Sequence, residues 1–293
     1  MRTDIQPFDI KSDMEGIIAC ITDRLSRQES PLVIAVCGGT STGKTTVVTQ
    51  LIRSAFSGRT SLISQDHFQL LKVGRDELDP RYGLDHVDHY GIDDCMALVD
   101  QLRQGDGCRM PRFDFKTRRH VGSQYVASRS VVIVEGLYSA YGDLRKSADM
   151  VIYIESCAYE RLIRRIFRNR FERYVGLPQD GNRSVFNYLT RVIRAHQDFV
   201  KSQRPDADFI LNNPIRFGFL LDKYGIPTPI SPAPNERQNV WMQEFLNTQC
   251  AFHVDREGTQ HYFSIRWGDV PFFETPVEAD TLELILTQDW LEM

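Results

Sequence analysis

The residues best suited to chemistry lie in one short loop that fits the pattern G-x-x-x-x-G-K-[ST]. An apolar run at 32–37 precedes it and predicts a buried strand, and an apolar-periodic stretch at 46–52 follows it and predicts a helix. Between such elements, backbone N–H groups and a helix N-terminus can surround a phosphate. We expect Lys44 to reach the outer phosphates and the Thr45 hydroxyl to ligate Mg²⁺. The residues predicted to bind the nucleotide are Gly38, Gly39, Thr40, Ser41, Thr42, Gly43, Lys44, Thr45 and Thr46.

Two carboxylates end apolar runs further along the chain. Asp66 comes directly after a predicted strand at 61–65, and Glu135 follows another at 130–134. Ligands of open α/β sheets bind beyond the carboxyl ends of the strands. We therefore expect Asp66 to take a proton from a substrate hydroxyl and to help hold Mg²⁺, and Glu135 to order the same ion. The structural alternatives are a turn or helix N-cap at Asp66 and a salt-bridged strand end at Glu135.

The stretch 161–173 contains six arginines and belongs to a predicted helix over 159–173. Guanidinium groups bind phosphoryl oxygens in a fork and never deprotonate, so this helix could close over a nucleotide as a lid. A solvated face and an RNA-binding strip are the alternatives. The arginines that recur on one helical face are Arg161, Arg164, Arg165 and Arg168.

The segment 85–89 mixes carboxylates and imidazoles at short spacing. It could hold a metal ion, but no cysteine ligands accompany it, so we favour a loop that hydrogen-bonds a hydroxylated substrate. The other histidines, His120 among them, form no pattern that indicates chemistry.

The composition is that of an ordinary globular chain. Its 293 residues suffice for one large domain with an appendage, and its formal net charge of -4 provides no general attraction to nucleic acid. No apolar stretch approaches the ~20 residues of a membrane span. The acidic N-terminus does not fit a signal peptide, and the six scattered cysteines favour reduced thiols. We expect a cytoplasmic protein with a small-molecule substrate and with neither nucleic-acid nor membrane partners, and a homo-oligomer stays open.

Strand and helix patterns alternate along the chain up to residue 213, which predicts a parallel sheet covered by helices. The expected fold class is α/β, a three-layer P-loop NTPase sandwich with a parallel sheet and a small α+β C-terminal extension. Within that extension we expect a hairpin and two helices. The expected parts are an N-terminal helix at 1–30, a P-loop domain at 31–213, a proline-rich linker and extension of unknown role at 214–293, helices at 240–248 and 280–291, and a hairpin of 251–254 with 261–267.

In several ordered blocks the chain resembles the uridine kinase and phosphoribulokinase family of small-molecule kinases. Together with the phosphate loop, the blocks cover roughly residues 30–213. The further blocks resemble S-x-D-x-F at 63–68, F-D-H-P-D at 84–88, P-x-Y-D-F at 111–115, F-E-G at 134–136, the lid helix at 161–173 and A-D-x-I-I at 206–210.

The resemblance implies roles for particular side chains. Asp66 would be the catalytic base, and Asp85 would hold ribose hydroxyls. Phe113 and Phe115 would line the nucleoside pocket, where Phe113 replaces the family's tyrosine. Arg118 stands where pyrimidine kinases carry a histidine that reads the base, and His120 lies two positions further on. Arg165 and Arg168 would contact phosphates, whereas the lid arginine expected after R-G is absent from 173–175.

These features predict an ATP-dependent phosphotransferase with an alcohol group as acceptor. ATP (or GTP) and Mg²⁺ would bind at the loop, with Thr45, Glu135 and Asp66 at the metal, and the favoured acceptor is a nucleoside or ribosyl-like compound. One alternative is a kinase of pantothenate, ribosylnicotinamide, a sugar phosphate or a sugar acid, because Arg118 would favour an anionic acceptor. A nucleic-acid-binding ATPase is the third candidate. The expected catalytic residues are Asp66, Lys44, Arg165 and Arg168.

Overall fold

The computed structural model describes residues 10–70, 79–173, 181–214, 251–254, 260–267 and 270–281. The chain forms two compact units. The first consists of Met1–Ser156 with Arg194–Asn213, and the second of Cys157–Ile193 with Pro214–Met293. Within the described ranges, no helix is both long and apolar enough to cross a membrane.

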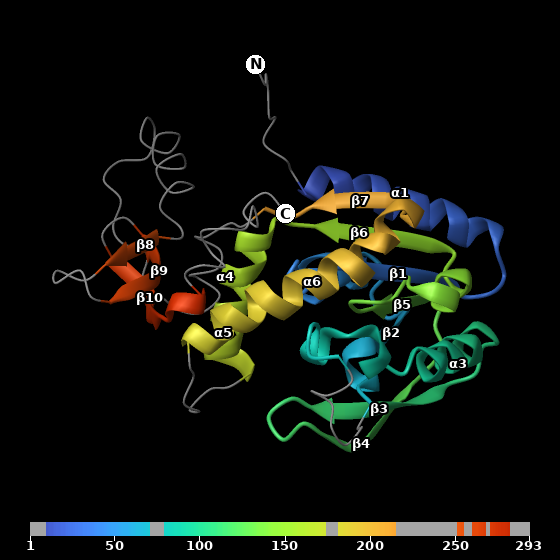
Figure 1. Ribbon diagram of the computed structural model, residues 1–293. Coiled ribbons are helices and arrows are strands. Elements are labelled where there is room, and N and C mark those ends of the chain that lie inside the picture. Colours follow the sequence, from blue (N-terminus) through green and yellow to red (C-terminus); the bar gives the residue numbers. More distant parts are fainter. Residues whose placement is uncertain are drawn as a thin grey trace. The chain divides into compact units, whose positions relative to one another are not determined.

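The first unit is built on a sheet of five parallel strands in the order β2-β5-β1-β6-β7 (Figure 1). Every residue of the central strands β1 and β5 is buried, because helices cover both faces of the sheet. Because both faces of these strands are buried, their sequences are continuous apolar runs and not alternating patterns. The predicted parallel sheet is confirmed. The strands are β1 (Leu32–Gly38), β2 (Thr60–Ser64), β5 (Val131–Glu135), β6 (Met150–Glu155) and β7 (Phe209–Asn212).

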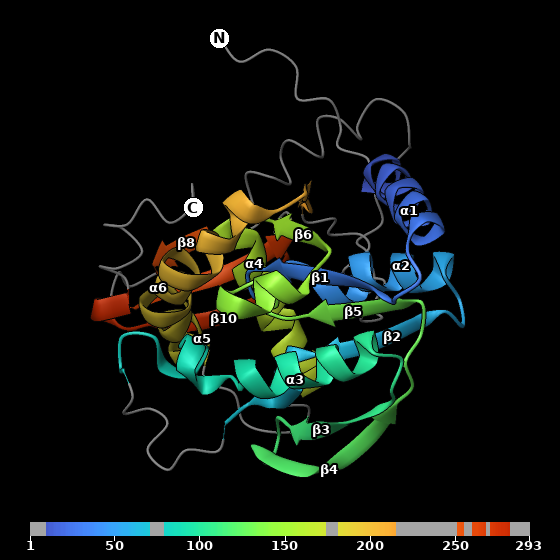
Figure 2. The ribbon, with the colours of Figure 1, turned by 90° about the vertical axis from the view of Figure 1, so that its right-hand side faces the viewer.

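Two layers of helices enclose this sheet. On one face, α1 (Ile10–Arg27) and α2 (Gln50–Ala55) pack apolar side chains such as Ile17 against β1 and β6. On the other face, α3 (Ile92–Arg103) packs side chains such as Val99 against β5. Figure 2 shows α2 and α3 on opposite sides of β1 and β5. This arrangement is the three-layer α/β sandwich that the sequence predicts.

A two-stranded antiparallel hairpin, β3 (Cys108–Asp114) and β4 (Arg119–Val126), extends the first unit. The hydrophobic pattern does not predict this hairpin, because β4 exposes all its residues but the last and so lacks an apolar alternation. The pairing shifts register between Pro111 and Phe113, and proline has no N–H to donate at such a point. The register pairs Phe113 with His120 across the hairpin.

The second unit combines helices with an antiparallel sheet in the order β10-β9-β8. β8 (Ala251–Val254) pairs with β9 (His261–Trp267), which confirms the predicted hairpin, whereas β10 (Val270–Val277) is not predicted. The backbone N–H of Glu278 donates to the Asn182 side chain of α5 at 3.2 Å. Most of the proline-rich linker and the predicted helix at 240–248 lie outside the described residues, as does all but the start of the helix predicted at 280–291.

Short helical turns complete the described elements. The predicted arginine-rich helix consists of an α-helix and a π-helical turn, and a further run of helical segments with several turn types covers residues 181–206. These elements are η1 (Lys44–Thr49), η2 (Gln65–Phe68), η4 (Gly83–Asp85), η5 (Val87–His89), η6 (Gly142–Ser147), α4 (Ala158–Arg168), η7 (Asn169–Arg173), α5 (Gly181–Asn187), η8 (Tyr188–Val192), α6 (Ile193–Ala195), η9 (His196–Val200) and η10 (Lys201–Asp206).

Candidate functional site

The phosphate loop follows β1 and takes backbone conformations that favour glycine. Gly38 has a φ of 137°, and a Cβ there would overlap a carbonyl oxygen of β6. Gly43 has a φ of 93°, and Ser41 between them has a φ of 60°. The Lys44 ammonium donates to the carbonyl oxygens of Gly38 and Gly39 at 2.9 and 2.7 Å, so the lysine folds back over the loop.

The loop has the polar groups that a phosphate needs. The Thr42 hydroxyl donates to the Gly39 carbonyl at 2.9 Å and closes the turn. The Ser41 hydroxyl oxygen is buried and has no hydrogen-bond partner among the described residues. Buried polar atoms are nearly always hydrogen-bonded, so this hydroxyl fits a ligand oxygen. The loop is therefore suited to the phosphates of a nucleotide, with Lys44 able to turn toward them.

Asn213 hydrogen-bonds to the phosphate loop, and no sequence motif described above includes this residue. Its side-chain amide donates to the Thr42 carbonyl at 2.7 Å, and its backbone N–H donates to the Glu155 carbonyl at 2.9 Å. A Cβ on Gly43 would overlap the same amide nitrogen. The available signal was a polar residue just beyond the last parallel strand, at the edge of the sheet where ligands bind.

Glu135 lies at the carboxyl end of β5 and is buried. Its carboxylate accepts a hydrogen bond from Thr49 at 3.2 Å. Burial raises the pKa of Glu135 above its ordinary value, and hydrogen bonds from Thr45 and Ser64 lower it. The charges of Asp66 and Lys44 also reach this carboxylate, the first raising its pKa and the second lowering it. Thr45 thus hydrogen-bonds to Glu135, and Asp66 and Lys44 lie near enough for their charges to act on the same carboxylate.

Oxygen atoms are the ligands that Mg²⁺ prefers, and it usually keeps several waters beside one or two carboxylates. Glu135, Asp66 and the Thr45 hydroxyl offer such a donor set next to the phosphate loop. Among the described residues, no group of three or more His, Cys, Asp or Glu side chains is placed to hold a metal ion. The metal-cluster alternative at 85–89 therefore gains no support from the structure.

The 3₁₀ turn η2, which carries Asp66, is tied to the hairpin through two imidazoles. The Phe113 backbone N–H donates to His67 Nδ1 at 3.1 Å, and His120 Nε2 lies 2.8 Å from the Gln69 carbonyl oxygen. Burial lowers the pKa of His67, which keeps this ring a neutral acceptor, although the Asp66 carboxylate opposes the shift. The two rings thus link β3 and β4 to the segment of the expected base.

The aromatic residues predicted for the acceptor pocket lie together on the hairpin. The Phe113 ring makes edge contacts with Phe115 at 5.3 Å and with His120 at 5.4 Å between centroids. Arg118 is exposed in the turn between β3 and β4, with a φ of 52°. His120, which contacts the Phe113 ring, lies two positions beyond the residue at which the family pattern places the base-reading side chain.

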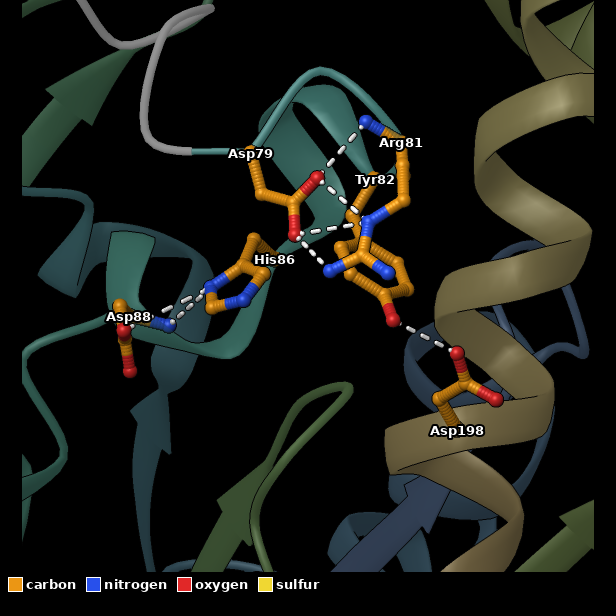
Figure 3. Close-up of polar contacts among 6 residues, drawn as sticks. All are labelled: Asp79, Arg81, Tyr82, His86, Asp88 and Asp198. Carbon is orange, nitrogen blue, oxygen red and sulfur yellow. Dashed lines mark hydrogen bonds and ion pairs between the residues drawn. The ribbon is translucent and has the colours of Figure 1, made fainter.

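Asp85 ends η4 and is half-buried. Polar contacts fix the segment on both sides of it, as Figure 3 shows. Before it, the Arg81 guanidinium pairs with the Asp79 carboxylate at 2.6 Å. After it, the backbone N–H of Asp88 donates to His86 Nδ1 at 3.1 Å. A short loop bearing one carboxylate is thus held in a defined conformation.

The expected lid arginines belong to α4 of the second unit. A capping box formed by Cys157 and Glu160 begins this helix, and the Tyr188 hydroxyl donates to the Ala158 carbonyl at 2.7 Å. Arg165 and Arg168 are half-buried. Arg161, predicted on the same face, is instead fully buried, and its guanidinium nitrogens have no hydrogen-bond partner among the described residues.

Residues 33–214 match the model of the phosphoribulokinase/uridine kinase family. The chain belongs to this family. The match covers the phosphate loop, both carboxylates, the hairpin and α4, and it ends next to Asn213. The resemblance read from the sequence blocks is therefore confirmed.

Comparison with individual relatives shows how much of this chain is similar to each of them. The chain is 32% identical over 195 residues to uridine/cytidine kinase UKL1, chloroplastic, of Arabidopsis thaliana, and the match covers 65% of this chain and 39% of that protein. It is 30% identical over 188 residues to the uridine kinase of Brevibacillus brevis, covering 62% of this chain and 85% of the relative. The chain thus spans well under half the length of the plant relative.

A solved structure carries the same fold at low sequence identity. The D-glycerate 3-kinase of Cryptococcus neoformans var. grubii aligns with a TM-score of 0.51 and 14% identity, over 66% of this chain and 89% of that chain. At this identity the likeness concerns the fold alone. It confirms the predicted P-loop α/β architecture of the family.

Proposed function

We propose that this protein transfers the γ-phosphoryl group of ATP to a hydroxyl of a nucleoside or ribosyl-like compound. The observation that carries the proposal is the grouping of Lys44, Thr45, Asp66 and Glu135 at the carboxyl edge of the parallel sheet. Membership of the phosphoribulokinase/uridine kinase family and the names of the relatives support a nucleoside-type acceptor. The proposal also includes a cytoplasmic location.

The residues of this chain would divide the reaction among them. The phosphate loop binds and orients the nucleotide, and Lys44 turns from its carbonyl contacts to the outer phosphates. Asp66 accepts the proton of the acceptor hydroxyl as that oxygen attacks. Thr45, Glu135 and Asp66 would hold Mg²⁺, which supplies positive charge to the transferred phosphoryl group when bound. Arg165 and Arg168 would neutralise the charge that remains on it.

The acceptor pocket would use Asp85, Phe113, Phe115 and the hairpin. Asp85 offers a carboxylate to vicinal hydroxyls, and the aromatic rings offer a stacking surface for a base. The contact of His120 with Phe113 supports an acceptor with a base that can hydrogen-bond to an imidazole, and His120 and Arg118 are both exposed. A nucleoside therefore has better support than a sugar phosphate or a sugar acid.

The first prediction concerns the base. Replacing Asp66 by Asn removes the proton acceptor but leaves the phosphate loop intact, so kcat should fall by about 10²–10⁴-fold while the nucleotide still binds. ADP release with a panel of nucleosides, vitamins and sugar acids measures turnover, and calorimetry measures nucleotide affinity. Asp106→Asn, at an exposed position after α3, is the matched control. Unchanged turnover in the Asp66 variant would remove that residue from the base role, and a panel with no phosphorylated nucleoside would refute the acceptor class.

A further inference from the structure

Tyr138 is a buried tyrosine just beyond β5 that belongs to none of the sequence motifs described above. Its side chain is fully buried, and its hydroxyl donates to the backbone carbonyl of Asp85. Its backbone N–H donates to the Gln65 side chain at 2.8 Å, directly before Asp66 in the chain. One residue therefore contacts both the segment of the expected base and the segment of the expected hydroxyl-binding carboxylate.

Tyr82 contacts the same carboxylate segment from its other side. The backbone N–H of Asp85 donates to the Tyr82 carbonyl at 3.2 Å. The Tyr82 hydroxyl donates to the carboxylate of Asp198, on η9, at 2.7 Å, as Figure 3 shows. Both backbone polar groups of Asp85 are thus bound by tyrosines, the N–H by Tyr82 and the carbonyl by Tyr138.

We propose that Tyr138 and Tyr82 are positioning residues that set the place of the Asp85 carboxylate relative to Asp66, and hence the affinity for the acceptor. The inference rests on the proposed function, because it takes Asp85 as the group that binds acceptor hydroxyls. Neither tyrosine touches the phosphate loop in any described contact. Their effect should therefore fall on the acceptor and not on the nucleotide.

Packing around Tyr138 makes the arrangement stiff. Its ring makes an edge contact with Tyr90 at 5.1 Å between centroids. A Cβ on Gly136 would overlap the Gln65 side chain, so the strand end and the Asp66 segment are in close contact. Burial raises the pKa of Tyr138 well above its ordinary value, so the phenol stays a donor throughout the working pH range.

The test uses single-atom changes in the full chain. Tyr138→Phe and Tyr82→Phe each remove one hydroxyl. Tyr141→Phe is the matched control, because its half-buried ring also packs on Tyr138 but no described contact uses its hydroxyl. We expect the KM for the acceptor to rise roughly 5- to 10-fold in each of the first two variants, as for one lost hydrogen bond, with kcat and the KM for ATP changed by less than about twofold.

A second measurement does not depend on turnover. Amide hydrogen exchange of peptides covering residues 83–90 should become faster in both variants and stay unchanged in Tyr141→Phe, while exchange of the phosphate loop stays the same. If the wild-type protein phosphorylates no nucleoside, the proposed function fails, and the exchange result still decides whether the tyrosines hold the segment. Unchanged exchange and acceptor KM in both variants would overturn the inference, as would an equal rise in the KM for ATP.

Discussion

Glu135 is a residue at which stability and the proposed chemistry oppose each other. Its carboxylate is buried at the end of β5, and that burial raises its pKa above the ordinary value. The folded protein therefore binds more protons at this group than the unfolded chain does. The free energy of unfolding consequently falls as the pH rises from the unfolded to the folded pKa of Glu135. A bound cation would supply the positive charge that offsets the buried negative charge of the Glu135 carboxylate.

The prediction at this residue is a gain in stability with a loss of activity. Glu135→Gln removes the buried charge but keeps an acceptor for Thr49. The melting temperature at pH 7.5 should therefore rise by roughly 2–4 °C for each kcal/mol by which the free energy of unfolding increases. Turnover should fall by about tenfold or more, because the substitution removes a carboxylate that we propose as a metal ligand. Thermal melts from pH 4 to 8 and Mg²⁺ titrations of activity measure both effects.

Glu29→Gln, at an exposed position after α1, serves as the comparison and should change neither quantity. A lower melting temperature for Glu135→Gln across the whole pH range would contradict the account of the buried charge. Full activity at ordinary Mg²⁺ concentrations would contradict the metal role.

The junction of β7 with the phosphate loop depends on one side chain. Asn213 is the first residue past β7, and its backbone continues the hydrogen bonding to β6 through the Glu155 carbonyl. Its amide then reaches the Thr42 carbonyl, so the last parallel strand restrains the loop that follows the first. A loop restrained before the ligand arrives loses less conformational entropy on binding.

We predict that Asn213→Ala weakens nucleotide binding by about 5- to 10-fold, since one hydrogen bond to the loop is lost. The KM for the acceptor should stay within about twofold. Calorimetric titration with ATP and magnesium measures the first quantity, and initial rates measure the second. The neighbouring Asn212→Ala removes a side chain without a described polar contact and should bind ATP like the wild type. Equal affinities in all three proteins would show that the loop needs no such restraint.

The two arginines expected to neutralise charge on the transferred phosphoryl group, Arg165 and Arg168, lie on α4. Positive charge from a helix that closes after the nucleotide has bound would act on the transition state more than on the bound nucleotide. The lid role of these arginines therefore makes a prediction about rates and not about affinity.

Arg165→Ala and Arg168→Ala should each lower kcat by about 10²–10³-fold, while the dissociation constant of ATP changes by less than about threefold. Single-turnover rates and equilibrium titrations separate the two effects. Arg194→Ala removes an exposed arginine at the start of the second segment of the first unit and should leave kcat unchanged. A variant of either lid position with wild-type kcat would contradict the lid assignment.

The sequence by itself determined the parallel strands, the phosphate loop and the two carboxylates Asp66, just after β2, and Glu135, at the end of β5. These features depend on residues that are close together in the sequence. A strand covered on both faces is a continuous apolar run, and Gly38 and Gly43 allow the positive φ angles that the loop requires. The sequence did not predict the hairpin β3–β4, because β4 is almost wholly exposed and therefore has no alternation of apolar and polar residues.

Only the tertiary structure decided which distant residues meet. Asn213 reaches a carbonyl 171 positions earlier, and Tyr138 reaches one 53 positions earlier. His120 pairs with Phe113 in the register of the hairpin and contacts its ring, whereas Arg118 lies in the turn with a left-handed backbone conformation. Such contacts depend on strand order, register and crossover connections, and the hydrophobic pattern of a single segment carries no information about them.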